Sequence, residues 1–137
     1  MLALAGGETS LPQIHAALDA AGFPTASRDA RTSGYSKGMR QKVAIALAIA
    51  RKAPVLLLDE PASGLDPVAA GELNQVLHSL RNAGTAILLV THDVPSAAEF
   101  ADRIGILRGG RIAREIGASG EQRFDLAMIV QQYRLDA

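Results

Sequence analysis

Two adjacent carboxylates at the end of an apolar run are the first residues of this sequence that could do chemistry. Residues 55–58 lead straight into Asp59 and Glu60, and Asp66 follows in a turn that contains a glycine. Charged groups at the mouth of a buried strand are costly unless something there uses the charge. A metal ion with phosphate oxygens would use it, with Asp59 on magnesium and Glu60 deprotonating an attacking water. The alternative is a solvated pair of strand-end acids.

A second group of residues, Tyr35-Ser36-Lys37-Gly38-Met39, has the features of an anion site at a helix start. Free N–H groups and the positive end of the helix dipole attract anions at such a position. Ser36 would add a hydroxyl donor, Lys37 a positive charge, and Gly38 a backbone that a ligand can approach closely. A serine at a helix start is also commonly a plain N-cap, without any ligand.

A histidine completes the set of candidates. His92 follows the apolar run at residues 86–90, which we expect to lie beside the acid-bearing strand. An imidazole there could donate a hydrogen bond to the terminal phosphate of the same ligand. The alternative is an ordinary loop histidine that is hydrogen-bonded to its surroundings.

The elements that position these residues follow from apolar periodicity and capping residues. Helical spacing predicts five helices, over residues 11–22, 36–52, 67–83, 94–101 and 122–135, with a polar loop at residues 23–34. The predicted N-caps include Ser10, with Gln13 at the spacing of a capping box, Asp66 and Asp93. Two uninterrupted apolar runs, residues 55–58 and 86–90, predict strands covered on both faces, as in a parallel sheet. Residues 104–107 predict a third strand, and the RGGR turn after it predicts a hairpin. This order is typical of an α/β fold, whose ligands bind beyond the carboxyl ends of the strands.

Composition narrows the class of partner. Among the 137 residues, 14 basic side chains balance 14 acidic ones, so nothing in the charge predicts nucleic acid as a partner. The chain has no cysteine, which excludes disulfides and thiolate metal sites.

Together, these motifs resemble the ATP-binding subunit of an ABC transporter. One unbroken run resembles four consecutive parts of the family: the signature motif, the helix after it, the Walker B strand and the D-loop. That run is TSGYSKGMRQKVAIALAIARKAPVLLLDEPASGLDP. The strand with the switch histidine resembles AILLVTHD, and the hairpin after it resembles RIGILRGGRIAREI. The match covers residues 33–116. The YSKGM signature, where the commonest form has glycine in place of Lys37 and glutamine in place of Met39, resembles ATPases of ABC-2-type exporters.

The resemblance implies that part of the site faces a second subunit. Ser36 and Gly38 would contact the γ-phosphate of an ATP molecule that the partner ATPase subunit holds. Lys37 and Met39 belong to the same signature and would be cofactor-binding residues with them. Asp66, in the D-loop, would couple the two subunits.

The resemblance implies that the other candidates act within their own subunit. Asp59 would support Mg²⁺, Glu60 would be the general base for the attacking water, and His92 would contact the γ-phosphate. The family works as a dimer of ATPase subunits with two ATP molecules between them, and dimer closure drives a membrane permease subunit. The resemblance therefore implies a cytoplasmic protein, peripheral at the inner face of the membrane.

One part of the family's nucleotide site is missing from the sequence. A phosphate-binding loop needs G-x-x-x-x-G-K-[ST] between a strand and a helix, and this sequence has no Gly-Lys pair. We therefore expect a partial P-loop NTPase fold of the α/β class, with a mostly parallel sheet that lacks the P-loop strand. Residues 1–42 would be a remnant of the helical subdomain with the signature, 43–117 a partial RecA-like core and 118–137 a helical tail.

The missing strand has consequences for stability and function. Backbone groups and apolar faces of the strands beside it would be exposed. We expect that this C-terminal portion cannot bind ATP fully or hydrolyse it alone, and that a second ATPase subunit supplies Walker A. The alternative is a non-catalytic module that binds a transporter or a full-length ATPase. A DNA-repair or chromosome ATPase head shares these motifs, but the sequence lacks long heptads and a basic stripe.

Overall fold

The chain folds into two compact units, Met1–Val90 and Thr91–Ala137. The computed structural model describes residues 10–118 and 124–135. No helix in these ranges combines the length and the apolar character needed to cross a membrane. The predicted boundaries after residues 42 and 117 follow subdomains of the ABC ATPase family, and they stay a prediction.

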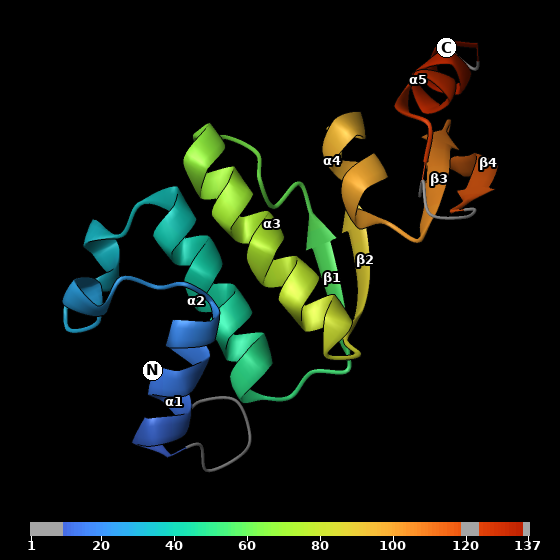
Figure 1. Ribbon diagram of the computed structural model, residues 1–137. Coiled ribbons are helices and arrows are strands. Elements are labelled where there is room, and N and C mark those ends of the chain that lie inside the picture. The colour runs from blue at the N-terminus through green and yellow to red at the C-terminus, as the bar shows by residue number, and fades with distance from the viewer. Residues whose placement is uncertain (1–9, 119–123, 136–137) are drawn as a thin grey trace. The chain divides into compact units, whose positions relative to one another are not determined.

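The described part of the first unit, residues 10–90, contains three α-helices and a parallel pair of strands (Figure 1). These are α1 (Leu11–Ala20), α2 (Lys37–Ala50), β1 (Val55–Asp59), α3 (Pro67–Asn82) and β2 (Ala86–Val90). Each element lies within two residues of its predicted bounds. The residues between α1 and α2 form two short 3₁₀ turns, Thr25–Ser27 and Thr32–Gly34, where the sequence predicts a loop.

Side chains hold the beginning of α1 and fill the space between the three helices. The N–H of Ser10 donates to Oε1 of Gln13 at 2.9 Å, at the predicted capping-box spacing. Gly22, with φ of +65°, ends the helix in the left-handed region. The buried apolar side chains of this unit are Ala17, Leu18, Ala21, Phe23, Tyr35, Ile45, Ala46, Leu56, Leu73 and Leu77.

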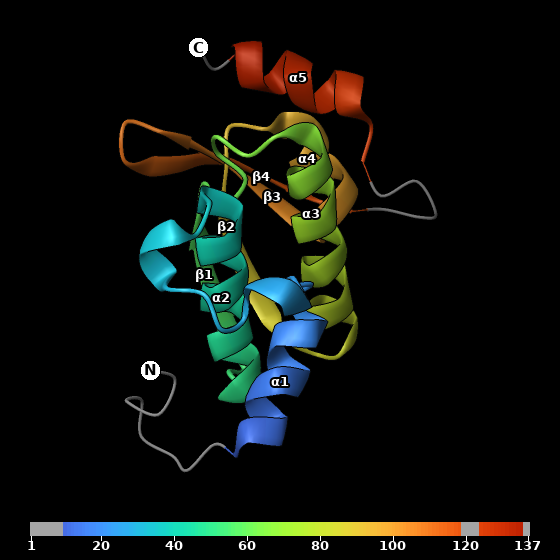
Figure 2. The same ribbon diagram turned by 90° about the vertical axis from the view of Figure 1, so that its left-hand side faces the viewer.

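The two-stranded sheet is covered on one face by the helices of its unit. β1 and β2 run parallel, with Leu57 opposite Leu88. Because side chains alternate along a strand, Leu56 is 8% exposed whereas Leu57 is 74% and Leu88 62% exposed. The helices α2 and α3 lie on the same side of the sheet (Figures 1 and 2). The prediction that these strands are covered on both faces is therefore wrong for this chain. The other expectation, that apolar strand faces are exposed, agrees with the exposure of Leu57 and Leu88.

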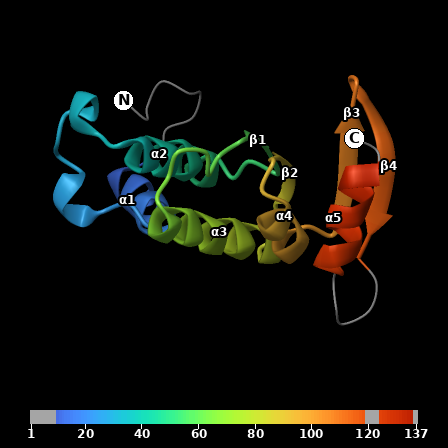
Figure 3. The ribbon, with the colours of Figure 1, turned by 90° about the horizontal axis from the view of Figure 1, so that it is seen from above.

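The second unit combines a hairpin with two helices. Its elements are α4 (Val94–Phe100), β3 (Arg103–Arg108), β4 (Arg111–Gly117) and α5 (Leu126–Leu135). The hairpin turns at Gly109 and Gly110, whose φ values of +51° and +76° suit a tight two-residue turn. Helix α5 packs against α4, and the buried apolar side chains among the described residues of this unit are Ala98, Phe100, Ile106 and Ile129. Figures 2 and 3 show the hairpin and the two helices from two further directions.

The described strands form two separate pairs, one parallel and one antiparallel. Among the described residues, β1 pairs only with β2, and β3 pairs only with β4, in antiparallel register. The predicted hairpin is confirmed. The predicted α/β class is confirmed as well, with a parallel sheet of two strands.

Candidate functional site

The strand β1 ends in an unusual backbone conformation at Glu60. The N–H of Glu60 donates to the carbonyl oxygen of Val90 at 2.8 Å and so extends the pairing of β1 with β2 by one residue. Glu60 has φ of +44°, in the left-handed region that residues other than glycine rarely adopt. The N–H of Ser63 donates back to the carbonyl oxygen of Glu60 at 3.0 Å and closes a turn. Such outliers concentrate at functional sites, which makes Glu60 a strong candidate.

The other strand-end acid, Asp59, offers an exposed oxygen ligand. It is the last residue of β1 and lies opposite Val90 of β2. Across residues 10–118 and 124–135, no three His, Asp or Glu side chains gather into a group that could hold a metal alone. Mg²⁺ usually takes one or two carboxylates and completes its shell with phosphate oxygens and water. The donor set of Asp59 therefore fits Mg²⁺ as one ligand of a site that includes phosphate.

The helix α2 begins with the N-cap that the sequence predicts. Oγ of Ser36 accepts the N–H of Met39 at 3.1 Å, and the N–H of Arg40 bonds to the carbonyl oxygen of Ser36 at 3.0 Å. The N–H groups of Lys37 and Gly38 lie in the first turn, where an α-helix provides no acceptor of its own. Two backbone donors and the positive end of the dipole therefore meet at this position, as an anion site requires.

Lys37 extends its side chain to the loop after β1. Its ammonium donates a hydrogen bond to the carbonyl oxygen of Ser63, 26 residues further along the chain. The next residue, Gly64, has φ of +70°, and a Cβ added there would lie 3.1 Å from Nζ of Lys37. Glycine at this position therefore suits both the turn and the approach of the lysine. Ser63 is not among the predicted site residues, and its one signal in the sequence is the Ser-Gly pair, a common turn marker.

Asp66 caps the next helix, as the sequence predicts. Its Oδ1 accepts the N–H groups of Val68 and Ala69, both at 3.0 Å, and Pro67 occupies the first helical position. Leu65, just before it, approaches the signature: a Cβ added to Gly38 would lie 3.5 Å from Cδ2 of Leu65. The starts of α2 and α3 and the loop between β1 and α3 therefore form one assembly within the first unit.

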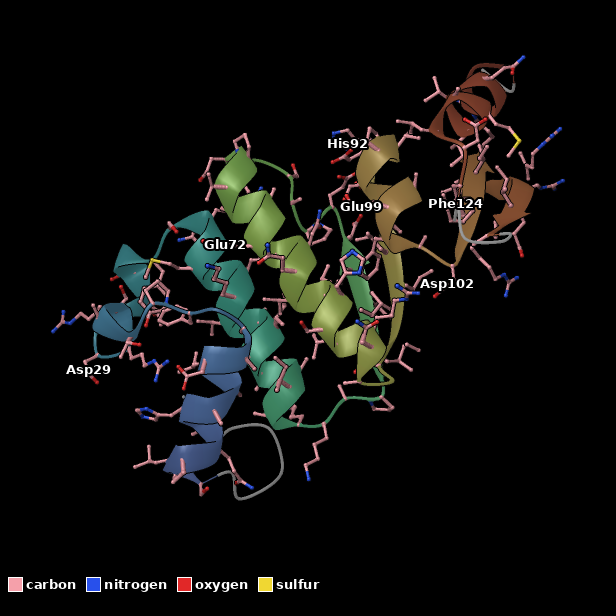
Figure 4. The ribbon with its side chains drawn as sticks, viewed as in Figure 1. Asp29, Glu72, His92, Glu99, Asp102 and Phe124 are labelled. Atoms are coloured by element: carbon pink, nitrogen blue, oxygen red, sulfur yellow. The ribbon has the colours of Figure 1, made fainter. Side chains whose placement is uncertain are left out.

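Three further contacts join the helices and the segment that lead into this assembly. Nζ of Lys42 on α2 lies 2.6 Å from Oε2 of Glu72 on α3, and Figure 4 shows the Glu72 side chain extending toward α2. The hydroxyl of Tyr35, next to the signature serine, donates to the carbonyl oxygen of Ser27 at 3.1 Å. The ring of Tyr35 also contacts Phe23, with centroids 5.2 Å apart.

His92 belongs to the second unit. It is exposed between β2 and α4, and its carbonyl oxygen accepts the N–H of Val94 at 3.1 Å. Asp93 caps α4, since its Oδ1 accepts the N–H of Ser96 at 3.2 Å. Figure 4 shows His92 at the beginning of α4. The predicted cap is confirmed, whereas the predicted contact of His92 with a phosphate stays a prediction.

A groove of about 350 Å³ lies at the far end of β1 from the acids. It is lined by residues around the ends of α2 and α3, among them Pro54, Leu56, Ala83 and Gly84. None of the predicted site residues lines this groove. The predicted site residues of the first unit lie instead at the carboxyl end of β1 and at the N-terminal ends of α2 and α3.

Sequence comparisons place these motifs in a known family. The family model described as "AAA domain, putative AbiEii toxin, Type IV TA system" matches residues 12–98. The chain is 44% identical over 104 residues to the cobalt import ATP-binding protein CbiO of Rhodobacter capsulatus, covering 76% of this chain and 37% of that protein. It is 38% identical over 109 residues to the daunorubicin/doxorubicin resistance ATP-binding protein DrrA of Streptomyces peucetius, covering 80% and 33%.

Solved structures give the same result. The dimeric, post-hydrolysis state of the ATP-binding cassette MJ0796 bound to ADP and Pi superposes with a TM-score of 0.73 at 30% identity, covering 84% of this chain and 51% of that one. The structure of cbiO1 from Clostridium perfringens, part of the ABC transporter complex cbiONQ, gives a TM-score of 0.69 at 25% identity, covering 91% and 47%.

These likenesses define the α/β fold of the P-loop NTPase class. The chain belongs to the ABC ATPase family, in which its relatives are the ATP-binding proteins of ABC transporters. It is a partial ABC ATPase region, since it spans about a third of the length of the two curated relatives and about half of the two solved chains. The relatives include an import protein and a drug-resistance protein, and the predicted exporter branch stays a prediction.

Proposed function

We propose that this chain forms the signature and Walker B part of the ATP-binding subunit of an ABC transporter. Its nucleotide site would be completed by a Walker A loop, which these 137 residues do not contain. The observation that carries the proposal is the left-handed conformation of Glu60, with its N–H bonded to Val90. A non-glycine residue in this conformation costs about 1–3 kcal/mol, and a catalytic role gives a reason for a glutamate there.

Each strand-end acid has a chemical role in the proposed reaction. The carboxylate of Glu60 accepts a proton from water as the water oxygen attacks the γ-phosphorus of ATP, and the bond from that phosphorus to the β–γ bridging oxygen breaks to release ADP and phosphate. Asp59 would hold Mg²⁺, which would offset negative charge on the phosphate oxygens. His92 follows Val90 by two residues along the chain and donates a hydrogen bond to the γ-phosphate.

The signature residues act on a second nucleotide in this proposal. The N–H groups of Lys37 and Gly38 and the hydroxyl of Ser36 stand at the start of α2 and face an ATP that a partner ATPase subunit holds. Met39 completes the signature, and Asp66 lies in the loop that meets the partner. This arrangement is supported by the likeness to a cassette whose structure is dimeric.

The partner and the location that we propose for this chain follow from its relatives. CbiO is a cobalt import protein, and cbiO1 belongs to the complex cbiONQ. A permease subunit in the membrane would be the element that this chain drives, with the ATPase peripheral at the cytoplasmic face. The YSKGM signature favours an ABC-2-type exporter as the transporter.

The test combines this chain with a separate N-terminal segment of an ABC ATPase that carries Walker A but lacks a signature and a Walker B strand of its own. We expect the chain alone to neither retain nor hydrolyse Mg-ATP, and the mixture to hydrolyse it. Glu60→Gln should lower the hydrolysis rate of the mixture about 10²–10⁴-fold while ATP binding persists. The matched control is Glu72→Gln, because Glu72 pairs with Lys42 on the helices rather than at the strand end.

Two results would contradict the proposal. Turnover of Mg-ATP by the chain alone would show that its site is complete. An unchanged rate for Glu60→Gln in an active mixture would show that this carboxylate is not the base.

The exposed face of the β1–β2 sheet favours a second candidate function. Leu57 and Leu88 lie opposite each other and are mostly exposed, together with Val55 and Val90 on the same face. Apolar surface of this kind is typical of protein interfaces. A non-catalytic module that binds a transporter or a full-length ATPase through this face would show no effect of Glu60→Gln on the rate of its complex.

A further inference from the structure

We infer that Lys37 is a positioning residue, which holds the turn that begins at Glu60 against the start of α2. The sequence alone suggested only a positive charge near a phosphate. In the structure, the Lys37 ammonium donates to the backbone carbonyl oxygen of Ser63, in the loop between β1 and α3. This contact joins the two parts of the candidate site that the sequence places 26 residues apart.

The partner of Lys37 is part of the turn that sets the backbone of Glu60. The N–H of Ser63 donates to the carbonyl oxygen of Glu60 at 3.0 Å, and the N–H of Leu65 donates to that of Ala62 at 3.1 Å. The peptide groups that flank Ser63 are therefore fixed at both ends: toward β1 through Glu60, and toward α2 through Lys37. A displacement of the start of α2 would pull on the same turn that holds the catalytic glutamate.

Packing around the contact supports the same conclusion independently of the hydrogen bond. A Cβ at Gly64 would lie 3.1 Å from Nζ and 3.8 Å from Cδ of Lys37, so the lysine stem lies directly on this residue. A Cβ at Gly38 would meet Leu65 at 3.5 Å and Ala69 at 3.9 Å. Glycines on both sides thus bring the start of α2 and the loop close enough for the lysine to reach the carbonyl.

The chemistry of an ammonium group makes this role compatible with an anion nearby. Lysine carries three N–H donors and no acceptor, and the Ser63 carbonyl uses one of them. A hydrogen bond from a charged donor is also stronger than one between neutral groups. Lys37 can therefore hold the turn while its charge still faces a phosphate at the helix start.

The importance of this turn for catalysis rests on the proposed function, in which Glu60 is the general base. The test of the contact between Lys37 and the turn does not need ATP. Amide hydrogen exchange in the full 137-residue chain reports the turn directly, through the N–H groups of Ser63 and Leu65. Lys37→Met keeps the length of the stem and removes the donor. We expect exchange at both amides to become about tenfold faster, the change that corresponds to one ordinary hydrogen bond. Amides in the interior of α3 serve as the internal reference for global stability.

Two variants make the result specific. Lys37→Arg retains a donor and should restore much of the protection. Lys42→Met removes another lysine of α2, whose partner is Glu72 on α3, and should leave Ser63 and Leu65 unchanged relative to the reference amides. Unchanged exchange in Lys37→Met, or an equal effect of Lys42→Met, would overturn the inference. Loss of catalysis in Glu60→Gln is measured separately, so either idea can fail while the other holds.

Discussion

The backbone N–H of Glu60 donates to the carbonyl oxygen of Val90 at 2.8 Å while Glu60 itself adopts φ of +44°. The hydrogen bond continues the β1–β2 ladder, and the dihedral angle ends the strand immediately afterwards. The ladder therefore constrains a residue whose own side chain disfavours the conformation. The acid is placed by pairing with the neighbouring strand and by the turn that the N–H of Ser63 closes on its carbonyl oxygen.

The backbone requirement at Glu60 can be measured with two substitutions. Both Glu60→Asn and Glu60→Val remove the carboxylate, but asparagine tolerates the left-handed region and a β-branched residue does not. We expect the valine variant to be less stable than the asparagine variant by about 1–2 kcal/mol, measured by urea denaturation. The same two substitutions at Glu72, inside α3, should give variants of similar stability, because asparagine and valine have similar helix propensities. Equal stability of the two Glu60 variants would contradict the assigned dihedral angle.

Asp66 should contribute to stability as a helix cap, whatever its role between subunits. Asp66→Ala removes the acceptor of two N–H groups and should cost about 1 kcal/mol of unfolding free energy. Asp66→Asn keeps a side-chain carbonyl oxygen and should cost clearly less. Thermal and urea unfolding followed by helical circular dichroism would compare the two. A loss in the asparagine variant as large as in the alanine variant would speak against capping through Oδ1.

Neighbouring leucines on β1 should respond very differently to truncation. Leu56 faces the helices and is 8% exposed, whereas Leu57 is 74% exposed. Leu56→Ala should lower the unfolding free energy by about 2–5 kcal/mol, and Leu57→Ala should change it by less than about 0.5 kcal/mol. Denaturation of the isolated chain measures both. A large cost for Leu57→Ala would mean that this face is covered in solution.

The stability of the segment before the signature should depend on the hydroxyl group of Tyr35. Tyr35→Phe removes the donor to the Ser27 carbonyl oxygen and should cost about 1 kcal/mol. Ser27→Ala is the matched control, because the acceptor is a backbone atom that this substitution keeps. The same stability in Tyr35→Phe and wild type would show that water replaces the bond without loss.

Much of the fold follows from local sequence. The helices and strands lie close to their predicted bounds because periodicity and capping residues act over a few neighbouring positions. Ser36 and Asp66 were predicted as caps for the same reason, and both accept backbone N–H groups. The glycine pair of the hairpin also has a local meaning, since its turn needs positive φ at both residues.

Other features depend on distant residues and could not be predicted. The conformation of Glu60 depends on Val90, thirty positions later, and the partner of Lys37 lies in another loop. An apolar run predicts burial but does not name what covers it. For this reason the sequence correctly identified Leu56 as a core residue, and wrongly placed Leu57 in the same category.

The cap of α2 has a consequence for how its serine can be probed. Oγ of Ser36 accepts the N–H of Met39 through one of its lone pairs, and this bond does not use the hydroxyl hydrogen. The oxygen thus serves the helix, and the hydrogen can serve a ligand. Aspartate in this position would cap equally well yet bring no proton and a negative charge. Substitution of Ser36 by aspartate would therefore keep the helix cap and remove the hydrogen-bond donor to an anion, which separates the two roles of this side chain.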